Sequence, residues 1–136
     1  MRMLQFFLLF IMFQAFSCPD DPPINPNNVV GLWHPFQIHW EEMECASLLD
    51  KNYFLDIRED KRSFALQLQS NSCGGDLRFE ERNGLQFNDI ECQSICCDSE
   101  EAKCLLDVLS EVKQYRIERD TLILKEGNIE LLLSRQ

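Results

Sequence analysis

Seven cysteines are the residues of this 136-residue chain with the most distinctive chemistry, because a thiol can form a disulfide, ligate a metal or carry a lipid. An odd number leaves one thiol over in an oxidising compartment. Cys18 stands apart near the N-terminus, and without it an even set of six remains. We therefore expect disulfides among these six, which are Cys45, Cys73, Cys92, Cys96, Cys97 and Cys104.

Residues 1–17 have the pattern of an export signal peptide. Arg2 precedes an apolar run that is too short to span a bilayer, and the small residues Ala15 and Ser17 follow. The segment Ala15-Phe16-Ser17-Cys18 resembles a relaxed bacterial lipobox, although the usual Leu or Val three positions before the cysteine is absent. The resemblance implies a lipid on Cys18. The alternative is ordinary cleavage near Ser17, which leaves Cys18 as a spare thiol.

Residues 18–28 contain four of the five prolines of the chain, which favours an extended tether over a packed segment. Asp20 and Asp21, just after Cys18, resemble the surface-export signal of Bacteroidetes-type lipoproteins. We therefore expect a cell-envelope lipoprotein, held by its lipid on the outer membrane, with periplasmic and surface-exposed orientations both open.

The charge of the chain excludes several kinds of partner. Arg2 is the one charged residue of the signal segment, so the mature chain sets 12 Lys and Arg against 23 Asp and Glu, a net charge of −11. This field repels phosphate backbones and anionic lipid headgroups, and no basic cluster interrupts it. Nucleic acid is therefore not an expected partner.

Alternating apolar and polar residues predict an antiparallel sheet with one buried face over residues 29–136. Gly31-Leu32-Trp33 starts the first strand, and Ile38 to Leu49 is expected to be an irregular connection. Asn83-Gly84 is expected to form a hairpin turn, since both residues tolerate positive φ. The continuous run Leu131-Leu132-Leu133 suggests a final strand covered on both faces.

The period changes to that of a helix between Asp98 and Lys113, where Leu105, Leu109 and Val112 fall on one face. Asp98, with Glu101 three residues later, is the expected N-cap. The sequence thus predicts a fold that is mainly β with one helix (α+β). About seven strands form a curled antiparallel sheet or cracked barrel that packs against one α-helix.

The order of these features resembles the META domain, also called HslJ-like, over Val29 to Ser134. The resemblance is carried by Gly31-Leu32-Trp33, Asn71 to Gly75, Gln93 to Cys97, the helix and the strands from Tyr115. It implies a small curled sheet with a helix against it, an envelope location, a role in stress response and no shared enzymatic activity. Gly replaces the Asn usual after the first cysteine of the family, and Gln93 replaces the usual Thr.

Cys73 and Cys97 stand where the family has its two cysteines, and we expect them to form a disulfide that links the hairpin to the helix start. Closing that loop stabilises the domain by roughly 3.5 kcal/mol. The pairing of the remaining four, Cys45, Cys92, Cys96 and Cys104, stays open among three connectivities.

A metal site is the alternative use of these thiols, but the spacing lacks paired Cys-x-x-Cys ligands, and we expect no bound metal or other cofactor. Histidines and acids also crowd one region without a His-Glu-x-x-His spacing, which indicates a solvated face rather than a ligand set. These residues are His34, His39, Glu41, Glu42 and Glu44, next to Cys45.

The sequence contains no nucleophile elbow, phosphate loop or dinucleotide fingerprint, so we do not expect an enzyme. The leading hypothesis is a lipid-anchored envelope domain with a binding or envelope-stress role, whose ligand is a partner protein or an apolar molecule held between sheet and helix. The alternative hypothesis is a secreted, disulfide-stapled inhibitor of hydrolases such as proteases or lysozymes.

Overall fold

The computed structural model describes residues 26–42, 45, 49, 52–93 and 99–136. Within them, eight strands, one α-helix and one 3-10 turn follow one another in a simple order, and the predicted class, mainly β with a single helix, is confirmed. The elements are η1 (Pro26–Asn28), β1 (Gly31–Trp40), β2 (Phe54–Ile57), β3 (Ser63–Gln67), β4 (Ser72–Glu80), β5 (Gly84–Cys92), α1 (Glu100–Glu111), β6 (Gln114–Glu118), β7 (Thr121–Glu126) and β8 (Ile129–Arg135).

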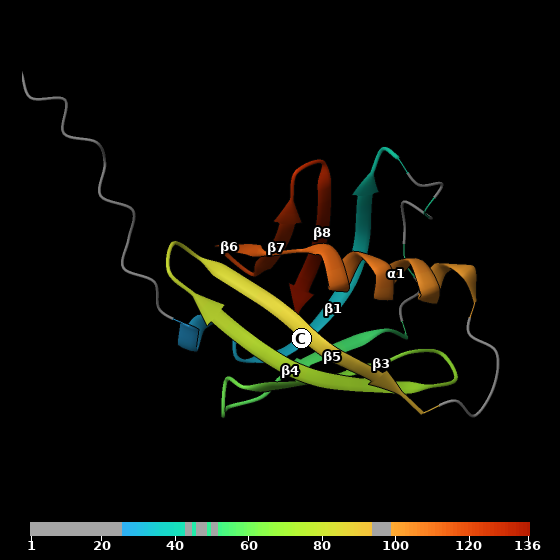
Figure 1. Cartoon of the computed structure of the whole chain (residues 1–136), viewed down its shortest axis with the longest axis horizontal. Coiled ribbons are helices and arrows are strands. Elements are labelled where there is room, and N and C mark those ends of the chain that lie inside the picture. Colours follow the sequence, from blue (N-terminus) through green and yellow to red (C-terminus); the bar gives the residue numbers. More distant parts are fainter. Residues whose placement is uncertain (1–25, 43–44, 46–48, 50–51, 94–98) are drawn as a thin grey trace, which may run out of the picture.

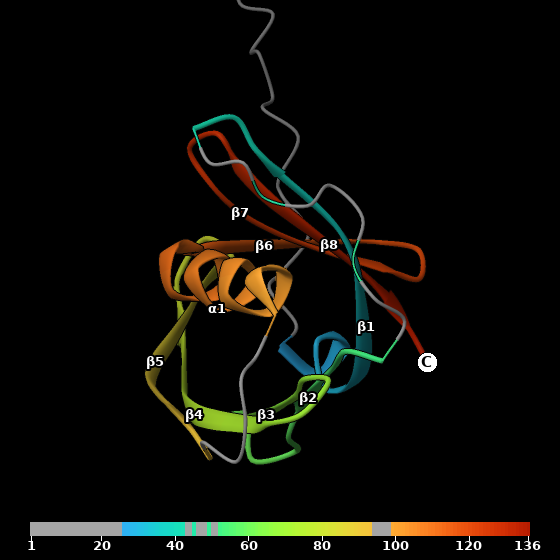
Figure 2. The same cartoon turned by 90° about the vertical axis from the view of Figure 1, so that its right-hand side faces the viewer.

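The strands form a closed antiparallel barrel in which each strand pairs with its neighbours in sequence, and β1 pairs with β8 to complete the ring. Figure 2 shows this ring, with α1 inside its curve on the side of β5 and β6. The β1–β8 pairing is long, from Trp33 opposite Arg135 to Trp40 opposite Ile129. Closure removes most of the edges that an open sheet would expose.

The first strand is longer than the sequence predicted. The expected irregular connection from Ile38 to Leu49 is wrong for its first three residues, because β1 continues to Trp40. A register shift between Pro35 and Gln37 inserts one extra residue, so the alternation resumes one position later and Ile38 is buried. Because the shift interrupts the alternation, the sequence pattern did not predict that β1 continues from Ile38 to Trp40.

The hairpin between β4 and β5 turns one residue earlier than predicted, through Arg82 and Asn83 and not through Asn83 and Gly84. Arg82 and Asn83 have the positive φ angles, 59° and 61°, whereas Gly84 is already the first residue of β5 and lies opposite Glu80. A Cβ on Gly84 would lie 2.6 Å from the Cβ of Glu80. Gly84 is therefore required for close approach of the two strands and not for a left-handed backbone.

The N-cap of the helix lies one residue after the predicted one. Ser99 is the N-cap, and its Oγ accepts a hydrogen bond from the N–H of Ala102 at 3.1 Å. The predicted cap, Asp98, lies outside the described residues. The hydroxyl of Tyr53 lies 3.2 Å from the Ser99 Oγ, so the cap is also tied to the chain before β2. Glu100 and Glu101 place negative charge on the positive end of the helix dipole.

One apolar core fills the ring, and α1 contributes to it directly. Leu105 and Leu109 of α1 are fully buried in the same cluster as Trp33 of β1 and Leu131 of β8. Burial alternates along β8, and Leu132 is only half-buried, so the expected cover on both faces of that strand is wrong. The helix covers the inner face alone.

The two ends of the described chain are held together. The indole N–H of Trp33 donates to the carbonyl oxygen of Val29 at 2.7 Å, and Val29 is fully buried. The guanidinium of Arg135 lies 4.3 Å from the centre of the Trp33 ring and donates to the carbonyl oxygen of Val30 at 3.3 Å. These contacts fix the first turn of the domain against its last strand.

In the residues that the structure describes, no helix has the length and apolar character needed to cross a bilayer.

We expect Tyr115→Phe to stabilise the domain. The Tyr115 hydroxyl is buried and has no hydrogen-bond partner among the described residues, so its removal should raise the free energy of unfolding by about 1 kcal/mol and the Tm by about 4 °C. Burial also raises the pKa of Tyr115 above its ordinary 10.0. The folded state therefore holds this proton more tightly than the unfolded state, and stability is lost as the pH rises above 10. Thermal unfolding at pH 7 and pH 11 measures both effects, and a less stable variant would contradict this assignment.

Candidate functional site

The disulfide between β4 and β5 differs from the predicted one. Cys73 pairs with Cys92, directly opposite it in the strand register, with Cα atoms 4.0 Å apart. The predicted Cys73–Cys97 bond is therefore wrong, and Cys97 itself lies outside the described residues. The reason is that β4 begins at Ser72, so Cys73 lies in a strand and not in a loop free to reach the helix.

A second disulfide joins Cys45, beyond the end of β1, to Cys104 on α1, with Cα atoms 5.9 Å apart. Cys104 is buried in the core cluster, so the bond attaches the segment after β1 to the inner side of the helix. Of the pairings left open among Cys45, Cys92, Cys96 and Cys104, Cys45–Cys104 occurs, whereas Cys92 is bonded to Cys73 and to none of the other three. Cys18 and Cys96, like Cys97, lie outside the described residues, and the expected lipid on Cys18 stays a prediction.

The histidines and acids near the end of β1 do not converge. His34 places its Nδ1 3.0 Å from the carbonyl oxygen of Tyr53, whereas His39 is exposed. Glu41 and Glu42 are exposed in the turn after β1, and Glu44 lies outside the described residues. Among the residues whose positions are described, no group of three or more His, Cys, Asp or Glu side chains could hold a metal ion.

The outer face of β3, β4 and β5 is hollowed where two glycines lie, and this hollow of about 700 Å³ is here called the glycine groove. Gly74 and Gly75 provide backbone in place of side chains, and a Cβ on Gly75 would lie 2.4 Å from the carbonyl oxygen of Asn88. The disulfide Cys73–Cys92 lies at one end. The charged residues of the lining are Arg58, Asp76, Asp89 and Glu91.

A β-bulge in β5 produces the close approach at Gly75. The register shifts between Gly74 and Asp76, so two residues of β5, Asp89 and Ile90, lie opposite Gly75 alone. Asp89 has a φ of 50°, an uncommon conformation for a residue other than glycine. The bulge bends the part of β5 from Asp89 to Cys92 and leaves the side chain of Asp89 exposed.

A second hollow, of about 400 Å³, lies on the other side of β5, between that strand and α1. We call it the β5–α1 hollow. Figure 1 shows α1 running beside β5. The apolar lining comes from Phe87, Ile90 and Leu106, and Asp107 of α1 adds a carboxylate. Asp89 and Cys92 line this hollow as well as the glycine groove, so the two hollows flank the same end of one strand.

The β5–α1 hollow exists because the barrel is barely closed at this point. Gly84 opposite Gln114 is the one residue pair that joins β5 to β6 among the described residues. Two backbone bonds of 2.9 Å support it, from the N–H of Leu85 to the Lys113 carbonyl and from the N–H of Tyr115 to the Asn83 carbonyl. Beyond Leu85, α1 takes the place that a longer β6 would occupy.

This surface was not predicted from the sequence, although one signal for it was present. Two adjacent glycines, Gly74 and Gly75, inside an alternating strand indicate a bulge or a close backbone approach. The resemblance to the META domain placed them in a loop instead. The second hollow depends on how far β6 extends alongside β5, which no local pattern reports.

The fold defines the chain as a small antiparallel barrel with a helix inserted before its sixth strand. A crystal structure of a DUF4847 family protein from Bacteroides vulgatus ATCC 8482 has a similar fold, with a TM-score of 0.58 at 10% sequence identity, over 78% of this chain and 92% of that protein. At this identity the likeness concerns the fold alone. No family model matches the chain, and no curated protein sequence matches it. Membership in the META family stays a prediction.

Peptide mapping without reduction should recover Cys73 linked to Cys92 and Cys45 linked to Cys104. The loops they close differ in length, so losing the Cys45–Cys104 bond should cost about 4 kcal/mol and losing Cys73–Cys92 about 3 kcal/mol. Denaturant unfolding of paired Cys→Ser variants measures this order. Recovery of a Cys73–Cys97 peptide would show that the assigned connectivity is wrong.

Gly75→Ala should destabilise the domain by about 3 kcal/mol, because the added methyl group collides with backbone carbonyls of β5. Gly74→Ala is the matched control. There the nearest atom to an added Cβ is the Phe64 carbonyl oxygen at 3.1 Å, and we expect a loss of about 1 kcal/mol. Equal costs in urea denaturation would argue against the bulge.

Proposed function

We propose that this protein is an exported domain of the cell envelope, anchored by a lipid on Cys18, that acts by binding a partner protein and not by catalysis. The export pattern of residues 1–17 and the lipobox-like segment support the address. The two disulfides suit an oxidising compartment outside the cytoplasm.

The packed interior is the observation that favours a partner protein over an enclosed apolar ligand. Trp33, Leu55, Phe64 and Leu105 are buried in the core, so the protein's own side chains occupy the space between sheet and helix. The two hollows described above lie instead on the outside, on either side of β5. Binding at the outer surface therefore fits this barrel better than binding in its interior.

We propose a non-catalytic role because the sequence contains no nucleophile elbow, phosphate loop or dinucleotide fingerprint. In the described region His34 contacts a main-chain carbonyl and His39 lies exposed on β1. Inhibition of hydrolases has no separate observation in its favour. An assay panel of proteases and lysozymes tests it.

Intact-mass spectrometry of protein from the native membrane tests the anchor. A diacyl or triacyl mass on Cys18 is expected, and Cys18→Ser should move the protein from the membrane fraction to the soluble fraction. Ser17→Ala is the matched control and should stay on the membrane, since it keeps the thiol and a small residue before it. A mature chain with a free Cys18 would contradict the proposed anchoring.

A further inference from the structure

The edge of β5 that faces α1 has backbone hydrogen-bonding groups without a backbone partner in the part of the chain that the structure describes. Leu85 donates its N–H on this side, and the direction of bonding alternates along an antiparallel strand, so the groups of Phe87 point the same way. At the other end, Gln93 bonds to the β4 side, which turns the groups of Cys92, and of Ile90 two residues earlier, toward α1. Past Leu85, no backbone partner on this side exists among the described residues.

The helix does not cover this edge. The β5–α1 hollow runs along Phe87 to Cys92, and Asp89, Glu91 and Cys92 are exposed. Six residues span at most about 20 Å, and the bulge at Asp89 bends this edge between Phe87 and Ile90. An unpaired edge of this length is a template for a strand from another chain.

The charges beside the edge select the kind of strand. Asp89 and Asp107 line the hollow beside it, whereas Arg58 and Glu91 lie in the glycine groove. Ile90 and Leu106 are half-buried and offer an apolar contact. An added strand with alternating basic and apolar side chains would place its cations against the carboxylates and its apolar groups against Ile90 and Leu106.

Two occupants from this protein itself fit poorly. Residues 19–28 carry four prolines, which lack the N–H donor that strand pairing needs, and two aspartates, which the acidic edge would repel. A second copy of the chain would bring a like-charged edge against this one, and like charges opposite one another across a strand pair are destabilising.

Two disulfides tether the elements on either side of this edge. The Cys73–Cys92 bond holds the exposed end of β5 to β4, and the Cys45–Cys104 bond holds α1 to the segment after β1. Ordering a partner strand against a rigid edge costs less free energy than ordering both partners.

We infer that the edge of β5 from Phe87 to Cys92 binds an extended, basic segment of a partner protein as an added β-strand. This inference rests on the proposed function and names the site and the chemistry of the partner.

Binding of designed peptides to the full mature chain, measured by fluorescence anisotropy, tests the inference. The probe is an eight-residue peptide of alternating Lys and Val. We expect it to bind with an affinity that falls as salt is added, and a Glu-Val peptide not to bind. N-methylation of alternate residues, which removes the N–H donors of one edge, should abolish binding in one of its two registers.

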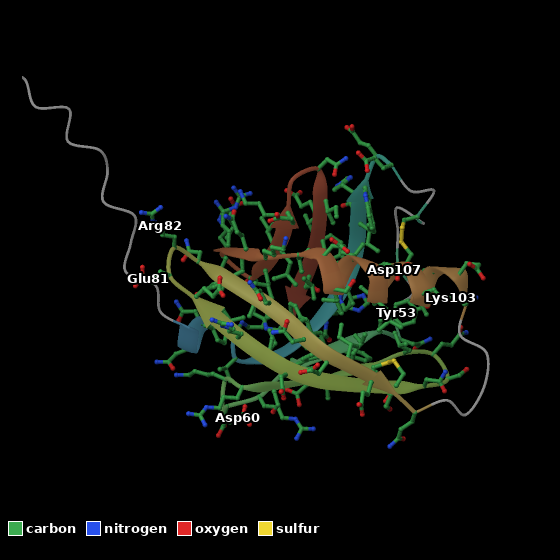
Figure 3. All side chains as sticks on the ribbon, in the orientation of Figure 1. Tyr53, Asp60, Glu81, Arg82, Lys103 and Asp107 are labelled. Carbon is green, nitrogen blue, oxygen red and sulfur yellow. A yellow bond between two sulfur atoms is a disulfide. The ribbon has the colours of Figure 1, made fainter. Side chains whose placement is uncertain are left out.

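Asp107→Lys supplies the site variant and Glu81→Lys the matched control. Figure 3 shows Asp107 on α1 and Glu81 at the tip of the β4–β5 hairpin, away from the hollow. Asp107→Lys should weaken the Lys-Val peptide about tenfold and Glu81→Lys should leave it unchanged. Full binding of both N-methylated peptides, equal effects of the two variants or no binding of the Lys-Val peptide would overturn the inference.

The lipid anchor on Cys18 and the binding edge of β5 can be refuted independently of each other. A lipidated chain that does not bind the Lys-Val peptide would refute this site but not the lipid-anchored envelope role. A chain with a free Cys18 that still binds the peptide through β5 would refute the anchor and leave the site standing.

Discussion

The weak junction between β5 and β6 is the constraint on which the rest of the structure depends. A meander of eight antiparallel strands closes by pairing each strand with the next, but here one residue pair, Gly84 with Gln114, joins these two strands in the described part of the chain. The helix stands where the remaining pairs would be. Its buried face, with Leu105 and Leu109, replaces the missing hydrogen bonds by apolar contact with the core.

A helix can fill a gap in a barrel without satisfying the strand edge beside it, because its own backbone groups are bonded within the helix. The part of β5 from Phe87 to Cys92 therefore has N–H and C=O groups that find no backbone partner on the α1 side among the described residues, next to a hollow. The bulge at Asp89 bends this part of the strand, and the same bulge requires Gly75. The bulge thus shapes the glycine groove, the short β5–β6 pairing leaves the β5–α1 hollow, and two disulfides hold the elements on either side.

Local patterns predicted much of the fold. Alternation at Ser63 to Gln67 and a helical period around Leu105 each depend on a buried face, and burial has a fixed period in each element. The errors arose where the alternation of buried residues is interrupted, and where the pairing of strands determines which cysteines lie opposite each other. The register shift near Pro35 hid the end of β1, and Cys73 lies opposite Cys92 only because β4 begins at Ser72. The resemblance to the META domain carried the wrong disulfide, since it placed that strand start in a loop.

Amide hydrogen exchange along β5, resolved residue by residue by NMR, tests the central claim that this strand has a free edge. The N–H groups of Phe87, Ile90 and Cys92 should exchange quickly, because they point toward α1 without a partner in the described structure. Those of Gln86, Asn88 and Glu91 should be protected, because they face β4. Uniform protection along the strand would contradict the account, since it would mean that β5 is paired on both sides.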